Sequence, residues 1–497
     1  MILELTTTFL LVWITWYLIT TYLERRLMPP GPFPLPVIGN MLQQDVKSGK
    51  PFHKLSKTYG DIMTLQLHTK CGFVNTASLA RKAKIEYNND VVSREQDIPL
   101  CKVLGPNDVV FAEYGTAFMF RKRVFKSAMH VFGAGIKAAQ EDFIVTCTLE
   151  QIKTLKDQPF SPQEIIGSAI MVQLRQWLTA EKVSLDDPVI MNLLEFSDLV
   201  ARKIPSIYLT YCMIPFHSYL PTKLSKFVKR GQNIKFSILS PVLKSHLETY
   251  TPGTIRDMAD SFIEAYKKEA AKENKKDIGS IEDIKALMID VAFPGSDTTS
   301  SSLSWFILYM TLYPETSQKI HEEIVHALGK DKLPRMDDAD NMPYLQATIC
   351  EVLRKTSPVS RAITVTINDV TLAGYYIPKG TTLMVNIPEV HLDEREWREP
   401  HKFKPERFLD ENGKFVGWTK YPAFMPFGLG RRECAGISFA KIMLFTFTAA
   451  LLQQLKFELP EGAERPAEDG PHLGIVNGPK NFYVITRKRR ACKDCVE

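Results

Sequence analysis

The feature that most limits the folds open to this chain is an apolar run near its start. No charged residue occurs between Leu5 and Leu23. As a helix, a run of this length would span about 28 Å, which is close to the thickness of the hydrocarbon core of a bilayer. Aromatic residues suited to the membrane interfaces lie within it at Trp13, Trp16, Tyr17 and Tyr22. We therefore expect a transmembrane helix, and the rest of the chain must fold as a separate body.

A cleaved signal peptide is the alternative for such a segment. The run is long, and it has neither a positively charged region before it nor a small-residue cleavage motif after it. Arg25 and Arg26 follow the run, so the positive-inside rule places the main body in the cytosol. The proline-rich stretch after them cannot continue a helix, because proline lacks an N–H and fixes φ. We expect an uncleaved anchor over residues 1–28, a stiff hinge over 29–36 and one domain over 37–497.

Charge and cysteine content narrow the classes of function. The net charge of +6 is a mild basic excess, which argues against nucleic acid and fits an anionic membrane surface or an acidic protein partner. The eight cysteines are scattered, without the dense framework of a small secreted protein. Cys492 and Cys495 form a single C-x-x-C, which is weak as a zinc or redox motif. Reduced thiols on the cytosolic side are expected.

Helical periodicity dominates the body, which shows no internal repeat and no Gly/Ser linker. Four long segments carry apolar residues at intervals of three and four, over 281–312, 315–328, 343–355 and 435–455. Short β-branched runs at 362–367 and 381–385 indicate strands. The expected fold class is mainly α with small β-sheets.

The most specific chemical motif is a glycine-rich loop that runs from Phe427 to Gly436 and enters the last helical segment. A thiolate that ligates haem iron needs protection from solvent, N–H groups aimed at its sulfur and a helix N-terminus that favours its charge. Glycines at 428, 430 and 436 allow tight turns, and Cys434 stands where the helix should begin. A buried, inert thiol is the usual interpretation of a single cysteine. Here ten residues fit the ligand pattern together.

This stretch closely resembles the cysteine-ligand loop of the cytochrome P-450 monooxygenases. The resemblance implies the fold of that family, with haem b between two long helices and Cys434 as the axial ligand of the iron. It also implies that Arg432 pairs with a haem propionate, that Phe427 packs beside the sulfur and that Gly436 belongs to the cofactor-binding loop. Three further stretches match the family in the correct order along the chain.

Two of these stretches are expected to be structural. Glu351 and Arg354 form Glu-x-x-Arg, a spacing that places both side chains on one helix face but is weak evidence alone. Arg407 lies in a segment that resembles the one whose arginine completes a buried network with that pair in the family. We expect these residues to serve folding and haem retention, and the loss of one to destabilise the fold by about 3–5 kcal/mol.

The third stretch, Pro294 to Thr299, lies inside a long helical pattern. In the family an acid–alcohol pair at this place relays protons to bound dioxygen, and Asp297 and Thr298 fit those two roles. A helix kink with solvent-facing polar residues is the alternative. Pro294 stands where the family usually has alanine, and it removes one helical hydrogen bond, so the groove beside it is expected to be wider or differently aimed.

Two other positions depart from the family pattern near the expected haem edge. Phe118 stands in place of the usual tryptophan and cannot donate to a propionate, so Lys122 or Arg123 is expected to make that contact. Thr364-Val365 occupies the place where the family often has His-Arg, which leaves Arg361 as a substitute. Haem affinity is expected to differ.

The order of anchor, hinge and catalytic body is that of the microsomal branch of the family. It implies a single-pass protein of the endoplasmic reticulum membrane with a cytosolic catalytic domain. The implied reaction inserts one oxygen atom from O₂ into a lipophilic substrate, with electrons from NADPH delivered by a membrane flavoprotein reductase. Cytochrome b5 is a candidate second partner, and no nucleic acid is expected.

The C-terminal third looks most like the animal branch that contains steroidogenic hydroxylases and aryl-hydrocarbon oxidisers, so we expect a steroid or a similarly rigid hydrophobe as substrate. By family position the substrate pocket should draw on 97–111, Ala292, Phe293, 359–363, Val476 and Asn477. Two alternatives stay open. One is a haem-thiolate isomerase or dehydratase that needs no reductase, and the other is a non-enzymatic haem- or lipid-binding relic.

Overall fold

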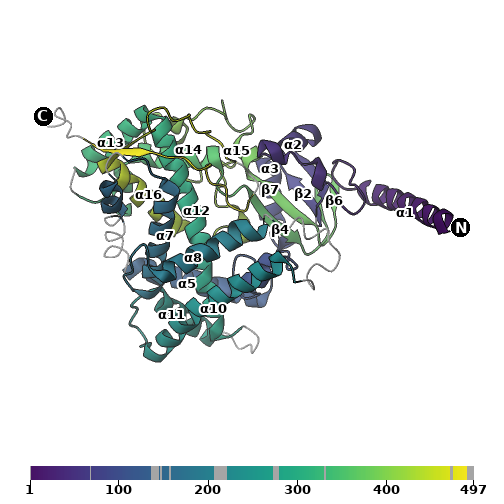
Figure 1. The fold of residues 1–497 in the computed structure, drawn as a ribbon, viewed down its shortest axis with the longest axis horizontal. Coiled ribbons are helices and arrows are strands. Elements are labelled where there is room, and N and C mark those ends of the chain that lie inside the picture. The colour runs from purple at the N-terminus through teal and green to yellow at the C-terminus, as the bar shows by residue number, and fades with distance from the viewer. Residues whose placement is uncertain are drawn as a thin grey trace.

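The structure is a computed structural model that describes residues 2–67, 69–135, 145, 148–155, 158–205, 207, 221–272, 279–329, 332–470 and 474–489. The fold is mainly helical with small sheets, as predicted. In Figure 1 the N-terminal helix projects from the end of the body that holds the sheet, while most long helices lie at the other end. The tail pair Cys492 and Cys495 lies outside the described residues.

Helix α1 (Ile2–Arg25) contains the apolar run. From Glu4 onward it is long and apolar enough to cross a membrane, and none of its most apolar window is buried in the protein. Helix α16 (Ile437–Gln454) meets the same criteria of length and composition, but 67% of its window is buried. Among the described helices, α1 is therefore the candidate membrane span that lies outside the core.

The proline-rich hinge is fastened to the first strand of the body. The N–H of Thr64 donates to the carbonyl of Pro30 at 2.8 Å, and Nη1 of Arg25 donates to the carbonyl of Pro32 at 2.9 Å. A Cβ at Gly31 would lie 2.0 Å from the carbonyl oxygen of Thr64, so this close approach requires glycine. The hinge therefore fixes the start of the body relative to the anchor.

A five-stranded mixed sheet lies at this end of the body, in the order β1-β2-β7-β4-β3. Its strands are β1 (Ile62–Gln66), β2 (Lys70–Val74), β3 (Val91–Ser93), β4 (Arg361–Thr366) and β7 (Thr382–Asn386). Only β2 and β7 pair in parallel, and Thr364 of β4 lies opposite Leu383 of β7. Two small antiparallel pairs are β5 (Val370–Leu372) with β6 (Tyr375–Ile377) and β8 (Leu455–Glu458) with β9 (Ile485–Lys488). The two predicted strands are confirmed to within one residue.

The remaining α-helices supply most of the body. They are α2 (His53–Tyr59), α3 (Ala77–Arg81), α4 (Pro99–Leu104), α5 (Thr116–Gly135), α7 (Pro162–Thr179), α8 (Pro188–Asp198), α10 (Lys223–Thr249), α11 (Met258–Lys272), α12 (Ile284–Leu312), α13 (Pro314–Leu328), α14 (Pro343–Thr356) and α15 (Ile387–His391). The four long predicted segments correspond to α12, α13, α14 and α16. Helix α12 begins three residues late, because Ile281–Asp283 forms a 3₁₀ turn whose capping box starts at Ser280.

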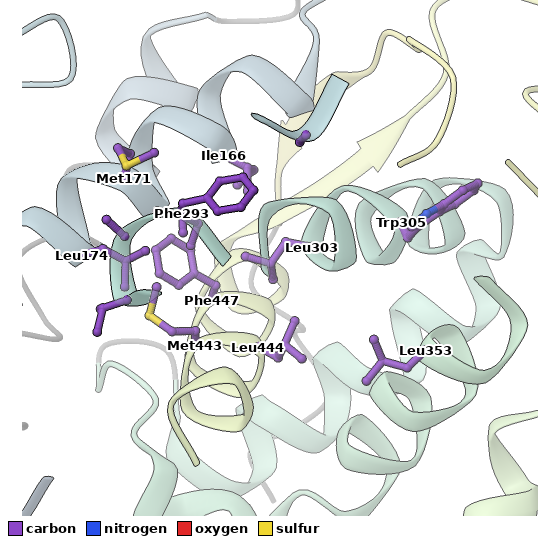
Figure 2. Close-up of a cluster of buried hydrophobic side chains, with 14 of the residues drawn as sticks. Ile166, Met171, Leu174, Phe293, Leu303, Trp305, Leu353, Met443, Leu444 and Phe447 are labelled. Atoms are coloured by element: carbon purple, nitrogen blue, oxygen red, sulfur yellow. The ribbon is translucent and has the colours of Figure 1, made fainter. Parts of the chain in front are cut away.

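The central helix α12 packs against α7, α14 and α16. Figure 2 shows side chains of this contact, including Leu174 from α7, Phe293 from α12 and Phe447 from α16. Burial of each such side chain stabilises the fold by roughly 1.5–3 kcal/mol. Burial along α12 is interrupted at Pro294, Asp297 and Thr298, which are only half-buried although they lie in the middle of the molecule. One face of this helix therefore borders an open space.

Candidate active site

That space is an interior cavity of about 1030 Å³ bounded by α12, strand β4 and the loop before α16. Ligand pockets commonly measure about 300–1,000 Å³, so this cavity can hold a large cofactor together with part of a substrate. Most lining side chains are apolar. The predicted site residues in its wall are Lys122, Asp297, Thr298, Phe427, Arg432, Cys434 and Gly436.

The cysteine loop turns tightly because of its glycines. Gly428 and Gly430 have φ of 73° and 71°, in the left-handed region that favours glycine. A Cβ at Gly430 would also lie 2.0 Å from the carbonyl oxygen of Lys84. The loop closes through a hydrogen bond of 2.9 Å from the N–H of Cys434 to the carbonyl of Phe427. These turns place Cys434 three residues before Ile437, the first residue of α16, so the helix begins slightly later than the sequence predicted.

Cys434 differs from the other cysteines of the described residues. Cys71, Cys101 and Cys350 are buried, whereas Cys434 presents its surface to the cavity. Its position deep in the molecule raises the pKa of its thiol, and a hydrogen bond from the backbone of Gly436 acts in the opposite direction. A positive group in the cavity is therefore needed to hold the sulfur as a thiolate.

Arg432 projects from the loop into the same cavity. Its Nε donates to the carbonyl of Val92 at 2.7 Å, and its Nη2 donates to the carbonyl of Ala112 at 2.7 Å. The third nitrogen, Nη1, is buried and has no hydrogen-bond partner among the described residues. The guanidinium lies 3.8 Å from the ring centroid of Phe118. A buried donor of this kind is costly unless a ligand accepts from it.

Two further cations lie in the wall near Arg432. Arg94 donates from Nε to the carbonyl of Val110 at 2.8 Å, and Lys84 is only 4% exposed. Burial, followed by the charge of Arg94, lowers the pKa of Arg432 to about 9. Burial also lowers the pKa of Arg94 to about 10. We call Lys84, Arg94 and Arg432 the cation cluster, and its charges repel one another.

The structure separates the two basic residues that sequence analysis could not distinguish. Lys122 lines the cavity, and its ammonium donates to the carbonyl of Arg431. Burial lowers the pKa of Lys122 to about 8. Arg123 instead lies 3.5 Å from a carboxylate oxygen of Glu269 and is absent from the cavity wall that the described residues form. Of the pair, Lys122 is the residue placed to meet a ligand.

Asp297 and Thr298 lie side by side on the cavity face of α12, which runs on without a break through Pro294. Oδ1 of Asp297 accepts from the hydroxyl of Ser197 at 3.0 Å, and burial raises the pKa of its carboxyl. The Thr298 hydroxyl donates to the carbonyl of Pro294 at 2.7 Å. Because Pro294 has no N–H, the carbonyl of Asp290 loses its helical donor. The two side chains are thus held at the cavity edge without being turned away from it.

Glu351, Arg354 and Arg407 form a second buried charged group, which we call the paired network. Arg354 donates from Nε and Nη2 to the two oxygens of Glu351 at 2.8 and 2.7 Å. Its Nη1 donates to the carbonyl of His391 at 2.7 Å. Nε of Arg407 lies 3.3 Å from Oε1 of Glu351. The Glu351 and Arg354 side chains are fully buried and lie outside the cavity wall of the described residues.

A thiol that faces a cavity three residues before a helix, in a wall that also holds three buried cations, is the arrangement expected of a haem-thiolate protein. Comparison with known proteins agrees, because the model of the Cytochrome P450 family matches residues 29–486. The chain belongs to this family. Cytochrome P450 2D4 of Rattus norvegicus is 32% identical over 474 residues, which cover 93% of this chain and 93% of the relative. Cytochrome P450 2D6 of Homo sapiens is 31% identical over 472 residues, covering 92% of this chain and 93% of the relative. The chain is thus a P450 monooxygenase, and haem b is the family's cofactor.

The residues present fit a haem. The family cofactor carries a metal that takes a thiolate and two carboxylates that take cations. Here Cys434 and the three residues of the cation cluster line one cavity, and Nη1 of Arg432 is buried without a partner in the described part of the chain. When bound, the haem supplies the activation of dioxygen.

Sequence reasoning missed Arg94 and Lys84. Arg94 follows a short β-branched run, which weakly indicates the end of a strand. Nothing near Lys84 in the sequence distinguishes it from a surface lysine. The predicted substrate segments mostly reach the cavity, including Phe293, Val359 and Val476. Ala292 and Asn477 are absent from the wall of the described residues, and Asn477 instead accepts from Trp305 at 3.0 Å.

Proposed function

We propose that this P450 is a membrane-anchored enzyme that inserts one oxygen atom from O₂ into a steroid-like or similarly rigid hydrophobe. Electrons would come from NADPH through a membrane flavoprotein reductase. The observation that carries the proposal is that Cys434 and Arg432 line one large cavity, and that Nη1 of Arg432 is buried without a partner among the described residues. The anchor over residues 1–28, the hinge over 29–36 and the single domain over 37–497 are part of the same proposal.

We assign the cofactor contacts as follows. Cys434 binds the haem iron through its sulfur, and the N–H of Gly436 donates toward that sulfur. Phe427 closes the loop beside Cys434 and shields the sulfur from water. Arg432 and Lys122 donate to propionates. The paired network serves folding, since its members stay outside the cavity wall of the described residues.

Asp297 and Thr298 are proposed to move protons at the cavity edge. Burial raises the pKa of Asp297, so its carboxyl can hold a proton closer to neutral pH than an exposed aspartate can. The Thr298 hydroxyl can turn from the carbonyl of Pro294 toward the cavity and pass a proton onward. The presence of this pair favours the monooxygenase over a reductase-independent isomerase, which tolerates the loss of both groups.

The substrate proposal depends on the cavity wall. Aromatic and branched apolar side chains line it away from the cysteine loop, among them Phe111, Phe293, Val359, Ile363 and Val476. Rigid apolar walls favour rigid apolar ligands, because little conformational entropy is lost on binding. A panel of steroids and polycyclic hydrophobes should shift the Soret band of the ferric enzyme. No shift with any of them would contradict this part of the proposal.

The partner and location follow from the surface and the anchor. Lys126 on α5 and Arg431 of the cysteine loop are exposed, together with Glu433 of the same loop, so these exposed cations outnumber the exposed carboxylate. Such a surface attracts an acidic partner, and we propose the reductase for it, with cytochrome b5 as a second partner. Helix α1 would place the protein in the endoplasmic reticulum membrane with its body in the cytosol.

The deciding experiment is the carbon monoxide difference spectrum of the reduced, purified protein. Wild type should show the red-shifted Soret band of thiolate ligation, and Cys434→Ser should lose it. Cys350→Ser is the matched control, since that buried cysteine is absent from the cavity wall of the described residues. A folded, haem-loaded wild type with a neutral-ligand band would overturn the assignment. Substrate turnover without NADPH and reductase would favour the isomerase instead.

A further inference from the structure

Lys84 is a lysine buried inside the cavity wall. It comes from the π-helical turn Lys82–Glu86, and only 4% of its surface is exposed. Its backbone carbonyl packs against Gly430 of the cysteine loop, where no Cβ would fit. Its ammonium donates to the hydroxyl of Thr364 on β4. The residue thus bridges the cysteine loop and the strand on which the family often carries a basic side chain.

Arg361, the substitute suggested by the sequence, lines the same cavity but does not lie beside Thr364. Side chains three residues apart on a strand point to opposite faces, so Arg361 and Thr364 face different ways on β4. Nη2 of Arg361 donates to the carbonyl of Gly474 at 3.0 Å. Its guanidinium lies 5.4 Å from the ring centroid of Phe52. The basic group beside Thr364 is therefore Lys84.

The charges around Lys84 lack a balancing anion. The charged residues that act on it, Arg94 and Arg432, have its own sign, and with burial they lower the pKa of Lys84 well below its ordinary value. Asp108 is the acid that acts on both arginines, and its Oδ2 is buried without a partner in the described part of the chain. Lys122 also lies in this wall, and both arginines act on it. The positive side chains here therefore outnumber the carboxylate of Asp108, and ligand carboxylates would offset part of that excess.

We propose that Lys84 donates to a haem propionate, as a third cation beside Arg94 and Arg432, in place of the basic side chain that the family often has at the position of Thr364. The inference rests on the proposed haem site. A carboxylate next to Lys84 would favour its charged form and accept a charge-assisted hydrogen bond, the stronger kind. Thr364 would then position the lysine.

The test uses the full-length holoenzyme and measures the transfer of ferric haem to apomyoglobin. Lys84→Met removes the charged donor, and we expect transfer to become about tenfold faster, the usual effect of one charge-assisted hydrogen bond. The propionate bending bands of the resonance Raman spectrum should shift as well. Lys84→Arg should stay near the wild type. Adding Thr364→His to Lys84→Met should restore slow transfer, because it returns a basic group to β4.

Lys82→Met is the matched control, since Lys82 lies in the same turn but is absent from the cavity wall of the described residues. Wild-type transfer and unchanged propionate bands in Lys84→Met would overturn the inference, and so would equal acceleration by Lys82→Met. If Lys84→Met accumulates no holoenzyme, haem transfer and the propionate bands are measured on Lys84→Gln and Thr364→Val instead. Wild-type values in both would overturn the inference. A wild type without the thiolate carbon monoxide band would refute the haem-thiolate proposal itself, whereas a normal band with unaffected variants refutes only the role of Lys84.

Discussion

Two buried groups of charges in this protein are built in opposite ways. In the paired network, Glu351 receives two hydrogen bonds from Arg354 and a third contact from Arg407, so each charge meets its opposite inside the chain. In the cation cluster, Arg432 keeps one buried nitrogen without a partner among the described residues, and the like charge of Arg94 acts on it more strongly than the carboxylate of Asp108. The first group is complete in the polypeptide, while we propose that the haem completes the second.

Whether a buried charge has an opposite partner in the chain distinguishes residues that serve folding from residues that serve binding better than burial does. Both groups are desolvated, and an unpaired buried charge is costly. A folded chain tolerates an unpaired buried charge only where a ligand supplies the opposite charge. Substitutions in the paired network should therefore damage the fold, whereas substitutions in the cation cluster should mainly release the haem.

The largest expected effect is from Glu351→Ala. It leaves Arg354 buried without its carboxylate, so the free energy of unfolding should fall by about 3–5 kcal/mol. Thermal and denaturant unfolding of the holoenzyme, followed by circular dichroism, measure the change. Glu195→Ala is the control, because it breaks the exposed pair with Arg230 and should change little. An equally small effect of Glu351→Ala would contradict the structural role.

A smaller effect of a different kind is expected from Arg432→Met. The variant loses the proposed propionate donor, so haem transfer to apomyoglobin should become roughly 10- to 100-fold faster, the range for hydrogen bonds to charged groups. Helix content measured by circular dichroism should stay near that of the wild type. Arg431→Met, which changes the exposed neighbour, should transfer haem at the wild-type rate. Unfolding of Arg432→Met without faster haem loss would erase the distinction between the two groups.

The sequence predicted those parts of the site that depend on neighbours along the chain. The cysteine loop was recognisable because its glycines stand at fixed distances from Cys434. In the structure Gly428 and Gly430 have positive φ, whereas Gly436 has φ of −98°. Helix α12 followed from periodicity, while Asp297 and Thr298 were singled out by the resemblance to the family. Local spacing determines such helices, and α12 and α16 were found to within two or three residues of the predicted bounds.

Features that depend on segments far apart in the chain could not be predicted. Lys84, Thr364 and Arg432 come from a helical turn, a strand and a loop, and only the packing of the sheet against the loop brings them together. Lys122 and Arg123 are adjacent on α5, so the direction in which each points depends on where the helix rests. The hydrogen bond that fastens the hinge to Thr64 could not be predicted either, because it joins residues far apart in the chain.

The expected effect that is smallest at neutral pH concerns His391, whose carbonyl accepts from Arg354 of the paired network. Its ring is fully buried, with Nδ1 3.0 Å from the hydroxyl of Ser357 and Nε2 accepting from the N–H of Met425 at 3.0 Å. Burial, followed by the charge of Arg354, lowers the pKa of His391 to about 3. The histidine thus stays neutral beside the paired network and adds no charge that would need a partner.

Neutral burial of His391 makes stability depend on pH in a defined direction. Below the ordinary histidine pKa, near 6.5, the unfolded chain binds a proton that the folded chain does not bind, so stability falls as pH drops from about 6.5 toward 3. The slope from this residue should be at most about 1.4 kcal/mol per pH unit, the value for one proton. His391→Gln can still accept from Met425 but does not titrate, so its stability should fall less over this window when unfolding is followed at several pH values. His326→Gln, at an exposed position of α13, should keep the wild-type slope. An unchanged slope in His391→Gln would mean that the folded protein takes up this proton, and the paired network would then lie beside a further charge.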